Sequence, residues 1–228
     1  MEKTIKIKSI VITVLIFICV FLILDVVPFI FLWAGMSAKG VPNQIALQKW
    51  AVKTSVFKFQ KIYTRNSILP LLVLSGDHDT AINYFNDLEK LGGADSLNTK
   101  LVTYSYIQSG DYENALRYAN MINDRSRMVQ VYIKLKNYAK ANNVVDSLLM
   151  EKDIKSSTYL YKSELLYNEG KYVEANNYID KALKSSSSYI DGLYMKSKIL
   201  TKLGRTAEAN KYFNIAKYAE AKRKEIYE

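Results

Sequence analysis

Hydrophobic residues are distributed in two different ways along this chain of 228 residues. Near the N-terminus they form one continuous run from Ile10 to Trp33, in which Asp25 is the single charged residue. Beyond this run they recur at intervals of three and four residues, which is the spacing of one face of an α-helix. We therefore expect one membrane-spanning helix at 10–33, followed by amphipathic helices that pack on one another.

The apolar run is long enough to cross a membrane. As a helix, its 24 residues would extend about 36 Å, against a hydrocarbon core of about 30 Å. Nineteen of them are Ile, Val, Leu or Phe, which together favour insertion by roughly 6–11 kcal/mol, whereas a central Asp opposes it by about 3 kcal/mol. A cleaved signal peptide would have a shorter apolar core and a small-residue cleavage site. The run therefore predicts an uncleaved anchor.

Asp25 is the unusual residue of the predicted span. It lies toward the C-terminal end of the span, and Pro28 follows it and leaves a backbone carbonyl without its helical partner. Two interpretations are open: Asp25 reaches toward the membrane interface, or it makes a polar contact with a membrane helix of a partner. Asp25 is therefore our candidate for a membrane partner contact.

The lysines around the span bear on its orientation. Three precede it (Lys3, Lys6 and Lys8) and three follow it closely (Lys39, Lys49 and Lys53). The N-terminal three lie nearer to the span and share the short tail with the amino terminus, whereas large C-terminal domains cross a membrane largely regardless of charge. We expect residues 1–9 to form a basic cytoplasmic tail and the C-terminal domain to lie outside the cytoplasmic membrane. The opposite orientation remains an alternative.

Residues 34–61 are predicted to form a linker and a basic amphipathic helix. Gly35, Gly40 and Pro42 indicate a turn. One helical face then carries apolar side chains, namely Ile45, Val52, Val56, Phe59 and Tyr63, and lysines lie off this face, namely Lys49, Lys53, Lys58 and Lys61. The helix either caps the domain that follows or lies on anionic lipid headgroups, and the two roles are compatible.

A short motif recurs through the rest of the chain. It starts with Gly or Lys, continues with a polar or aromatic pair, and has Ala five residues after its start. The starting residues are Gly76, Gly110, Lys136, Gly170 and Gly204, so the successive intervals are 34, 26, 34 and 34 residues. We expect the Gly at a start to form a turn with positive φ, and the Ala to allow close approach of two helices. The larger residue four positions later fills the remaining space.

With its 34-residue period, the motif of Gly110 to Ala119 and Gly170 to Ile179 resembles the tetratricopeptide repeat (TPR) family. The resemblance covers residues 62–220. It implies an all-α fold, in which an N-terminal transmembrane helix is followed by a TPR-like solenoid of about five helix-turn-helix units at 62–228. The continuous helical run from Thr206 to Glu228 is expected to be a polar capping helix.

In the TPR family the first helix of each unit lines a concave groove. The resemblance places nine residues of this chain in that partner groove: Lys100, Tyr104, Ile107, Gln130, Lys134, Tyr167, Tyr194, Lys198 and Lys202. With a net charge of +10, these lysines suggest an acidic segment or a C-terminal carboxylate of a protein partner. The alternative is a solvated basic face. The family's carboxylate clamp is not expected, because Tyr104 and Gln130 stand where its Asn would be.

The composition includes few residues suited to catalysis or metal binding. One Cys and one His exclude a disulfide framework and clusters of these metal ligands. His78, between Asp77 and Asp79, is explained as part of a capped turn. We therefore expect no catalytic residue, no cofactor and no metal, and hence no enzyme. Aromatic residues at helical spacing indicate packing, so nucleic acid is not expected as a partner.

Together these features predict a single-pass membrane-anchored TPR scaffold or adaptor. It would bind protein partners, through acidic segments or another membrane helix, within a hetero-complex of the membrane or cell envelope. One alternative is a cytosol-facing TPR receptor for precursor or chaperone tails. Another is a binder of anionic envelope polymer.

Overall fold

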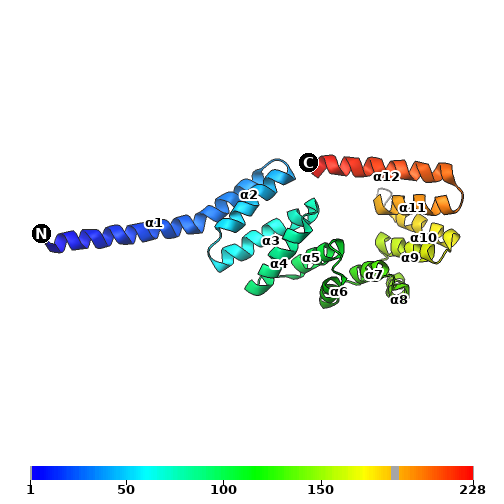
Figure 1. Ribbon diagram of the computed structural model, residues 1–228, viewed down its shortest axis with the longest axis horizontal. Helices are drawn as coiled ribbons and strands as arrows, with labels where there is room; N and C mark the ends of the chain where they lie inside the picture. The colour runs from blue at the N-terminus through cyan, green and yellow to red at the C-terminus, as the bar shows by residue number, and fades with distance from the viewer. Residues whose placement is uncertain (1, 186–189, 228) are drawn as a thin grey trace. The chain divides into compact units, whose positions relative to one another are not determined.

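The computed structural model describes residues 2–185 and 190–227, which contain twelve α-helices and no strand (Figure 1). The predicted all-α fold is confirmed. The chain divides into two compact units, Met1–Ser105 and Tyr106–Glu228. In chain order the helices are α1 (Glu2–Ser37), α2 (Val41–Thr54), α3 (Lys58–Ser75), α4 (His78–Leu91), α5 (Ser96–Gln108), α6 (Tyr112–Met121), α7 (Arg125–Lys134), α8 (Tyr138–Leu149), α9 (Ser156–Asn168), α10 (Tyr172–Ser185), α11 (Ile190–Lys202) and α12 (Thr206–Tyr227).

The first unit begins with a helical hairpin of α1 and α2 (Figure 1). The apolar helix continues to Ser37, so the turn is shorter than the linker predicted from Gly35, Gly40 and Pro42. Gly40 has a φ of 80° and immediately precedes α2. A Cβ on Gly35 would lie 2.7 Å from Cγ of Gln48, so glycine is what lets α1 and α2 approach so closely. α2 also packs against α3, the first helix of the first pair, and its capping role stays a prediction.

The single amphipathic helix expected between Ile45 and Tyr63 is wrong: the chain leaves the helix at Ser55 and re-enters it at Lys58. Hydroxyl groups pair with carbonyls at the end of α2, since Thr54 and Ser55 donate to the carbonyls of Trp50 and Ala51 at 2.9 and 2.7 Å. Gln60 then starts α3, because its Oε1 accepts from the backbone N–H groups of Val56 and Phe57. The apolar spacing continues across this break and conceals it.

Five helix pairs follow, from α3/α4 to α11/α12. All five motif starts have positive φ, the four glycines as predicted: Gly76 (83°), Gly110 (80°), Lys136 (56°), Gly170 (77°) and Gly204 (76°). At three of these turns the next residue caps the second helix with its side chain, as Asp111 does by accepting from the N–H of Asn114 at 3.1 Å. The predicted turns are therefore confirmed.

The repeated alanines lie in the interiors of their units, as predicted. Ala81, Ala115, Ala141 and Ala175 are fully buried and Ala209 is 2 % exposed. The residue four positions later is buried in the first four motifs, but Phe213 of the fifth is 43 % exposed. No described helix follows α12 to cover Phe213. The expected polar cap therefore carries exposed apolar side chains, Ile215 and Tyr218 among them.

Candidate functional site

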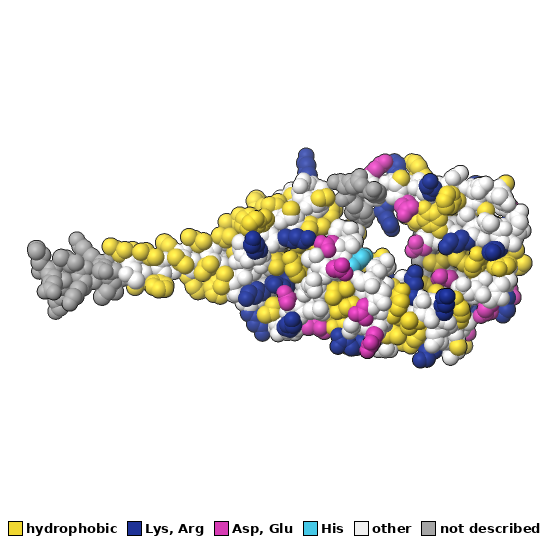
Figure 2. Space-filling model, viewed as in Figure 1, with side chains coloured by type: hydrophobic (Ala, Val, Ile, Leu, Met, Phe, Trp, Pro, Cys, Tyr) yellow, Lys and Arg dark blue, Asp and Glu magenta, His cyan; other side chains and the backbone are white. Residues whose placement is uncertain are grey.

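The N-terminal part of α1 exposes apolar side chains on all sides. Every large apolar residue from Ile12 to Leu24 is at least 37 % exposed, and within the described chain α1 is the one helix that is long and apolar enough to cross a membrane. Figure 2 shows hydrophobic side chains along the described part of this helix, with Lys and Arg side chains gathered on the segment that follows it. The side chains of residues 2–11, including the predicted basic tail, lie outside the description.

Asp25 contacts Gln60 of its own chain, and its predicted contact with a membrane helix of a partner stays a prediction. Its Oδ1 accepts from Nε2 of Gln60 at 3.1 Å. The same Nε2 lies 3.0 Å from the backbone carbonyl oxygens of Leu24 and Asp25. The Leu24 carbonyl is the one that Pro28, which has no N–H, leaves without a helical partner. Gln60 is fully buried, and its amide closes the gap in α1 while its Oε1 starts α3.

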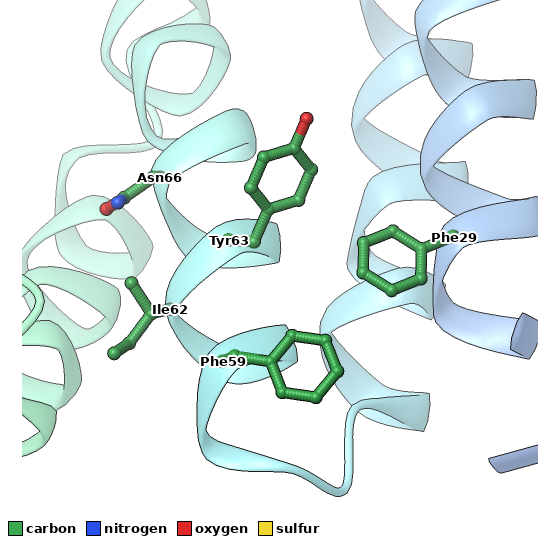
Figure 3. A pocket seen from close by; sticks show the side chains of 5 residues that line it. All are labelled: Phe29, Phe59, Ile62, Tyr63 and Asn66. Atoms are coloured by element: carbon green, nitrogen blue, oxygen red, sulfur yellow. The ribbon is translucent and has the colours of Figure 1, made fainter. Parts of the chain in front are cut away.

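Aromatic side chains join α1 to α2 and α3 around this polar contact. The ring centroids of Phe21 and Phe57 are 5.1 Å apart, and those of Phe29 and Tyr63 are 5.8 Å apart. Phe29 of α1 faces Phe59 and Tyr63 of α3 (Figure 3). A pocket of about 430 Å³ lies here, lined by Phe29, Phe59, Ile62, Tyr63 and Asn66. Most of its lining is apolar.

In the first unit, the predicted groove residues Lys100 and Tyr104 lie on α5. Lys100 is exposed, and the ring of Tyr104 packs edge-on against His78, with centroids 5.6 Å apart. Nδ1 of His78 lies 3.2 Å from Oγ of Ser105. Burial lowers the pKa of His78, while Asp79 and Asp77 beside it act in the opposite direction. His78 is thus part of the packing at a helix start, and the described residues contain no group of three potential metal ligands.

In the second unit, the predicted groove residues have different environments. Ile107 is 3 % exposed and belongs to the interior, so its assignment to the groove is wrong. Gln130 accepts from Arg127 at 2.9 Å, and the ring of Tyr167 packs against that of Tyr172. The hydroxyl of Tyr194 donates to Glu220 at 2.6 Å, which raises the pKa of Tyr194.

Lys134, Lys198 and Lys202 are exposed, and Lys134 and Lys198 act on the carboxylate of another first-helix residue. This residue is Glu164 of α9. It lies one repeat period of 34 residues after Gln130 and one before Lys198. Burial raises the pKa of Glu164, the charges of Lys134 and Lys198 oppose this shift, and Asp191 adds to it. The first helices α7, α9 and α11 pack side by side. We call Lys134, Glu164, Lys198 and Lys202 the first-helix charge row.

A second set of lysines connects successive helix pairs. Nζ of Lys196 lies 2.8 Å from Oδ1 of Asn176 and 2.5 Å from Oδ1 of Asp180. Nζ of Lys162 makes the same two contacts with the residues 34 positions earlier, Asn142 and Asp146. The sequence interpretation missed this set, although the repetition of Lys, Asn and Asp at the repeat period was available as a signal. These lysines support the fold and are not free for a ligand.

No protein-family model and no curated protein matches this chain. Solved structures do resemble it. The structure of NprR in complex with its cognate peptide NprX has a TM-score of 0.68 and 16 % identity, over 84 % of this chain and 66 % of that chain. A tetratricopeptide repeat protein from Parabacteroides merdae has a TM-score of 0.58 and 15 % identity, over 75 % of this chain and 70 % of its own.

MamA from Desulfovibrio magneticus RS-1 has a TM-score of 0.50 and 14 % identity, over 71 % of this chain and 96 % of its own. Together with the helix pairs and their turns, these similarities show that the chain has the TPR fold. This chain spans slightly less than two thirds of the NprR chain.

Proposed function

We propose that this protein is a single-pass membrane-anchored TPR scaffold, which binds a protein partner and helps to assemble or tether a membrane or cell-envelope complex. The observation that carries the proposal is the exposed apolar surface of α1 from Ile12 to Leu24, because α1 continues directly into the helical stack. A surface of this kind is stable in lipid and unstable in water. The scaffold has no catalytic role in this proposal.

The partner would bind along the first-helix charge row of the second unit. Support comes from the exposed lysines Lys134, Lys198 and Lys202 and from the similarity to NprR, which was solved with its cognate peptide. Three cations against one carboxylate favour an acidic segment of a protein partner. Glu164, desolvated between Lys134 and Lys198, would bind a basic group within such a segment and fix its position.

Crosslinking in native membranes, followed by recovery of the tagged protein, tests this partner site. The variant Lys198→Glu/Lys202→Glu should recover clearly less partner than the wild type. The matched control is Lys152→Glu/Lys184→Glu, which makes the same charge change at exposed positions outside the first helices. Helix content by circular dichroism should be unchanged in both variants. Equal recovery by both variants would show that the charge row is not the partner site.

The orientation has its own test. We place the amino terminus in the cytoplasm and the TPR units outside the cytoplasmic membrane, on the strength of the lysines before the span. Met150 is 86 % exposed, so Met150→Cys in a Cys19→Ser background should react with an impermeant thiol reagent in intact cells. Labelling only after lysis would instead support the cytosol-facing receptor.

A further inference from the structure

The turn between α2 and α3, residues Ser55 to Phe57, lies beside the middle of the apolar helix rather than beyond its end. The ring of Phe57 packs on Phe21, with centroids 5.1 Å apart, and Gln60 donates to the Leu24 carbonyl at 3.0 Å. Phe21 precedes Trp33, the last residue of the apolar run, by twelve positions, or about 18 Å along a helix. A bilayer that contains the apolar run therefore reaches the level of this turn.

The length of α1 indicates how deep the turn would lie. The part of the apolar run before the Gln60 contact, Ile10 to Leu24, has fifteen residues and is about 22 Å long. This is about 8 Å short of a hydrocarbon core of about 30 Å. Interfacial protein segments bury their apolar faces about 5–10 Å into the acyl boundary. If the turn and the start of α3 entered the bilayer to this depth, they would account for the roughly 8 Å of hydrocarbon core that Ile10 to Leu24 leave unspanned.

The surface around the turn has the composition of a membrane interface. Val56, Phe59 and Trp50 are 46 %, 54 % and 50 % exposed, and the pocket beside Phe29 continues this apolar surface (Figure 3). Exposed lysines border it at Lys53 and Lys58, with Nζ of Lys53 4.7 Å from the centroid of the Trp50 ring. Aromatic rings at the headgroup level and long basic side chains that extend to the lipid phosphates are typical of such interfaces.

The N–H groups of the turn can leave water at low cost, because all three are paired within the chain. Gln60 accepts from the N–H groups of Val56 and Phe57, and the Ser55 hydroxyl donates to the Ala51 carbonyl. In hydrocarbon each of these groups would otherwise cost several kcal/mol. A helix break that is closed in this way is compatible with the acyl region of a bilayer.

We infer that the α2–α3 turn enters the bilayer beside α1, with Val56, Phe57 and Phe59 among the acyl chains and Lys53, Lys58 and Lys61 on the phosphates of anionic phospholipids. This inference rests on the membrane anchoring proposed above. It assigns a lipid-binding surface to the first unit, so the membrane would hold the chain through a helix and a turn.

Spin labels on the full-length protein in vesicles distinguish this insertion from simple anchoring. Three single cysteines in a Cys19→Ser background carry the label: Ile16→Cys on α1, Val56→Cys in the turn, and Val173→Cys on α10, all at exposed positions. Accessibility to oxygen relative to a nickel chelate reports depth in the membrane. We expect this ratio at Val56 to approach the ratio at Ile16 and to exceed that at Val173 several-fold.

The other outcomes overturn one claim or both. A water-exposed label at Val56 with a buried label at Ile16 would overturn the insertion and leave the anchoring in place. Water-exposed labels at both positions would overturn the anchoring and the insertion together.

The lipid class is tested with the same Val56 label in vesicles of phosphatidylcholine alone or mixed with phosphatidylglycerol. The label should lie deeper in the mixed vesicles, and Lys53→Gln/Lys58→Gln/Lys61→Gln should abolish this difference. A matched variant at exposed positions outside both proposed sites, Lys152→Gln/Lys184→Gln/Lys211→Gln, should retain it. Equal depth in both vesicles, or a difference that survives in the first variant, would overturn the assignment to anionic lipid.

Discussion

The two units of this chain stabilise their internal polar groups in different ways. In the first unit a single buried side chain, Gln60, pairs with backbone groups of α1 and of the turn before α3. In the second unit Lys162 and Lys196 make the same two contacts at successive helix pairs. The comparison indicates that a repeated arrangement distributes stability over several contacts, whereas the junction with α1 concentrates it in one residue.

The largest effect should follow from Gln60→Leu. The substitution leaves the Leu24 carbonyl and the N–H groups of Val56 and Phe57 without partners, at a cost of about 1–3 kcal/mol for each buried group. We expect the free energy of unfolding of the first unit to fall by roughly 3 kcal/mol or more. Denaturant unfolding of the full chain in detergent measures it. The control Gln108→Leu, at an exposed position, should have little effect, and equal losses in the two variants would contradict the assigned role of Gln60.

The lysine contacts of the second unit should matter less, and unequally. The side chain of Lys196 is 6 % exposed and that of Lys162 is 17 % exposed. Replacement by Met keeps most of the apolar stem but removes the charged hydrogen bonds, so we expect Lys196→Met to cost about 1.5 kcal/mol and Lys162→Met about half as much. Thermal unfolding by circular dichroism compares the two variants. A larger cost at Lys162 would show that burial does not set the strength of these contacts.

The turns of the second unit allow a test in which one substitution should stabilise the protein. Lys136 has a φ of 56°, whereas the corresponding residue of the next motif is Gly170 with a φ of 77°. A side chain is strained in this region, so Lys136→Gly should raise the free energy of unfolding by about 0.5–1 kcal/mol, and Gly170→Ala should lower it by about 1 kcal/mol. Chemical denaturation measures both variants. A loss of stability in Lys136→Gly would indicate that the Lys136 side chain makes a stabilising contact.

The smallest effect concerns pH. Burial raises the pKa of Glu164 above the 4.5 of an unperturbed side chain, so the folded state binds its proton more tightly than the unfolded state. The contribution of protonated Glu164 to the free energy of unfolding is therefore fully present below the unfolded pKa of 4.5 and is lost as pH rises through the folded pKa. Glu164→Gln should be more stable than the wild type at neutral pH, and the advantage should disappear on acidification. Unfolding curves across this range measure it, and an advantage independent of pH would exclude titration of Glu164 as the cause.

The repeats could be predicted from the sequence because their signals are local. Gly110 and Gly170 are each followed within six residues by a helix start and a small residue, so the motif itself specifies turn and packing. The exposure of Phe213 could not be predicted in the same way. In the earlier motifs, burial of the corresponding residue depends on a following helix, whereas no described helix covers Phe213.

The junction with α1 could not be read from any period. Gln60 and Asp25 are 35 residues apart in the sequence, and the pairing occurs once, so no repetition indicates it. Pro28 did indicate an unpaired carbonyl, but not which residue would pair with it. The break at Ser55 was concealed because apolar residues keep the helical spacing on both sides of it.

The short turn between α1 and α2 determines how freely the first unit moves about its proposed anchor. Only Ala38, Lys39 and Gly40 separate the two helices, and Gln60 ties α3 to the same stretch of α1. A domain on a flexible linker explores a volume that grows with linker length. Its effective concentration at a fixed target falls accordingly. With the proposed anchoring, the short turn and Gln60 would hold the first unit at one height relative to the bilayer. A target at that height meets a high effective concentration, and one beyond it is out of reach.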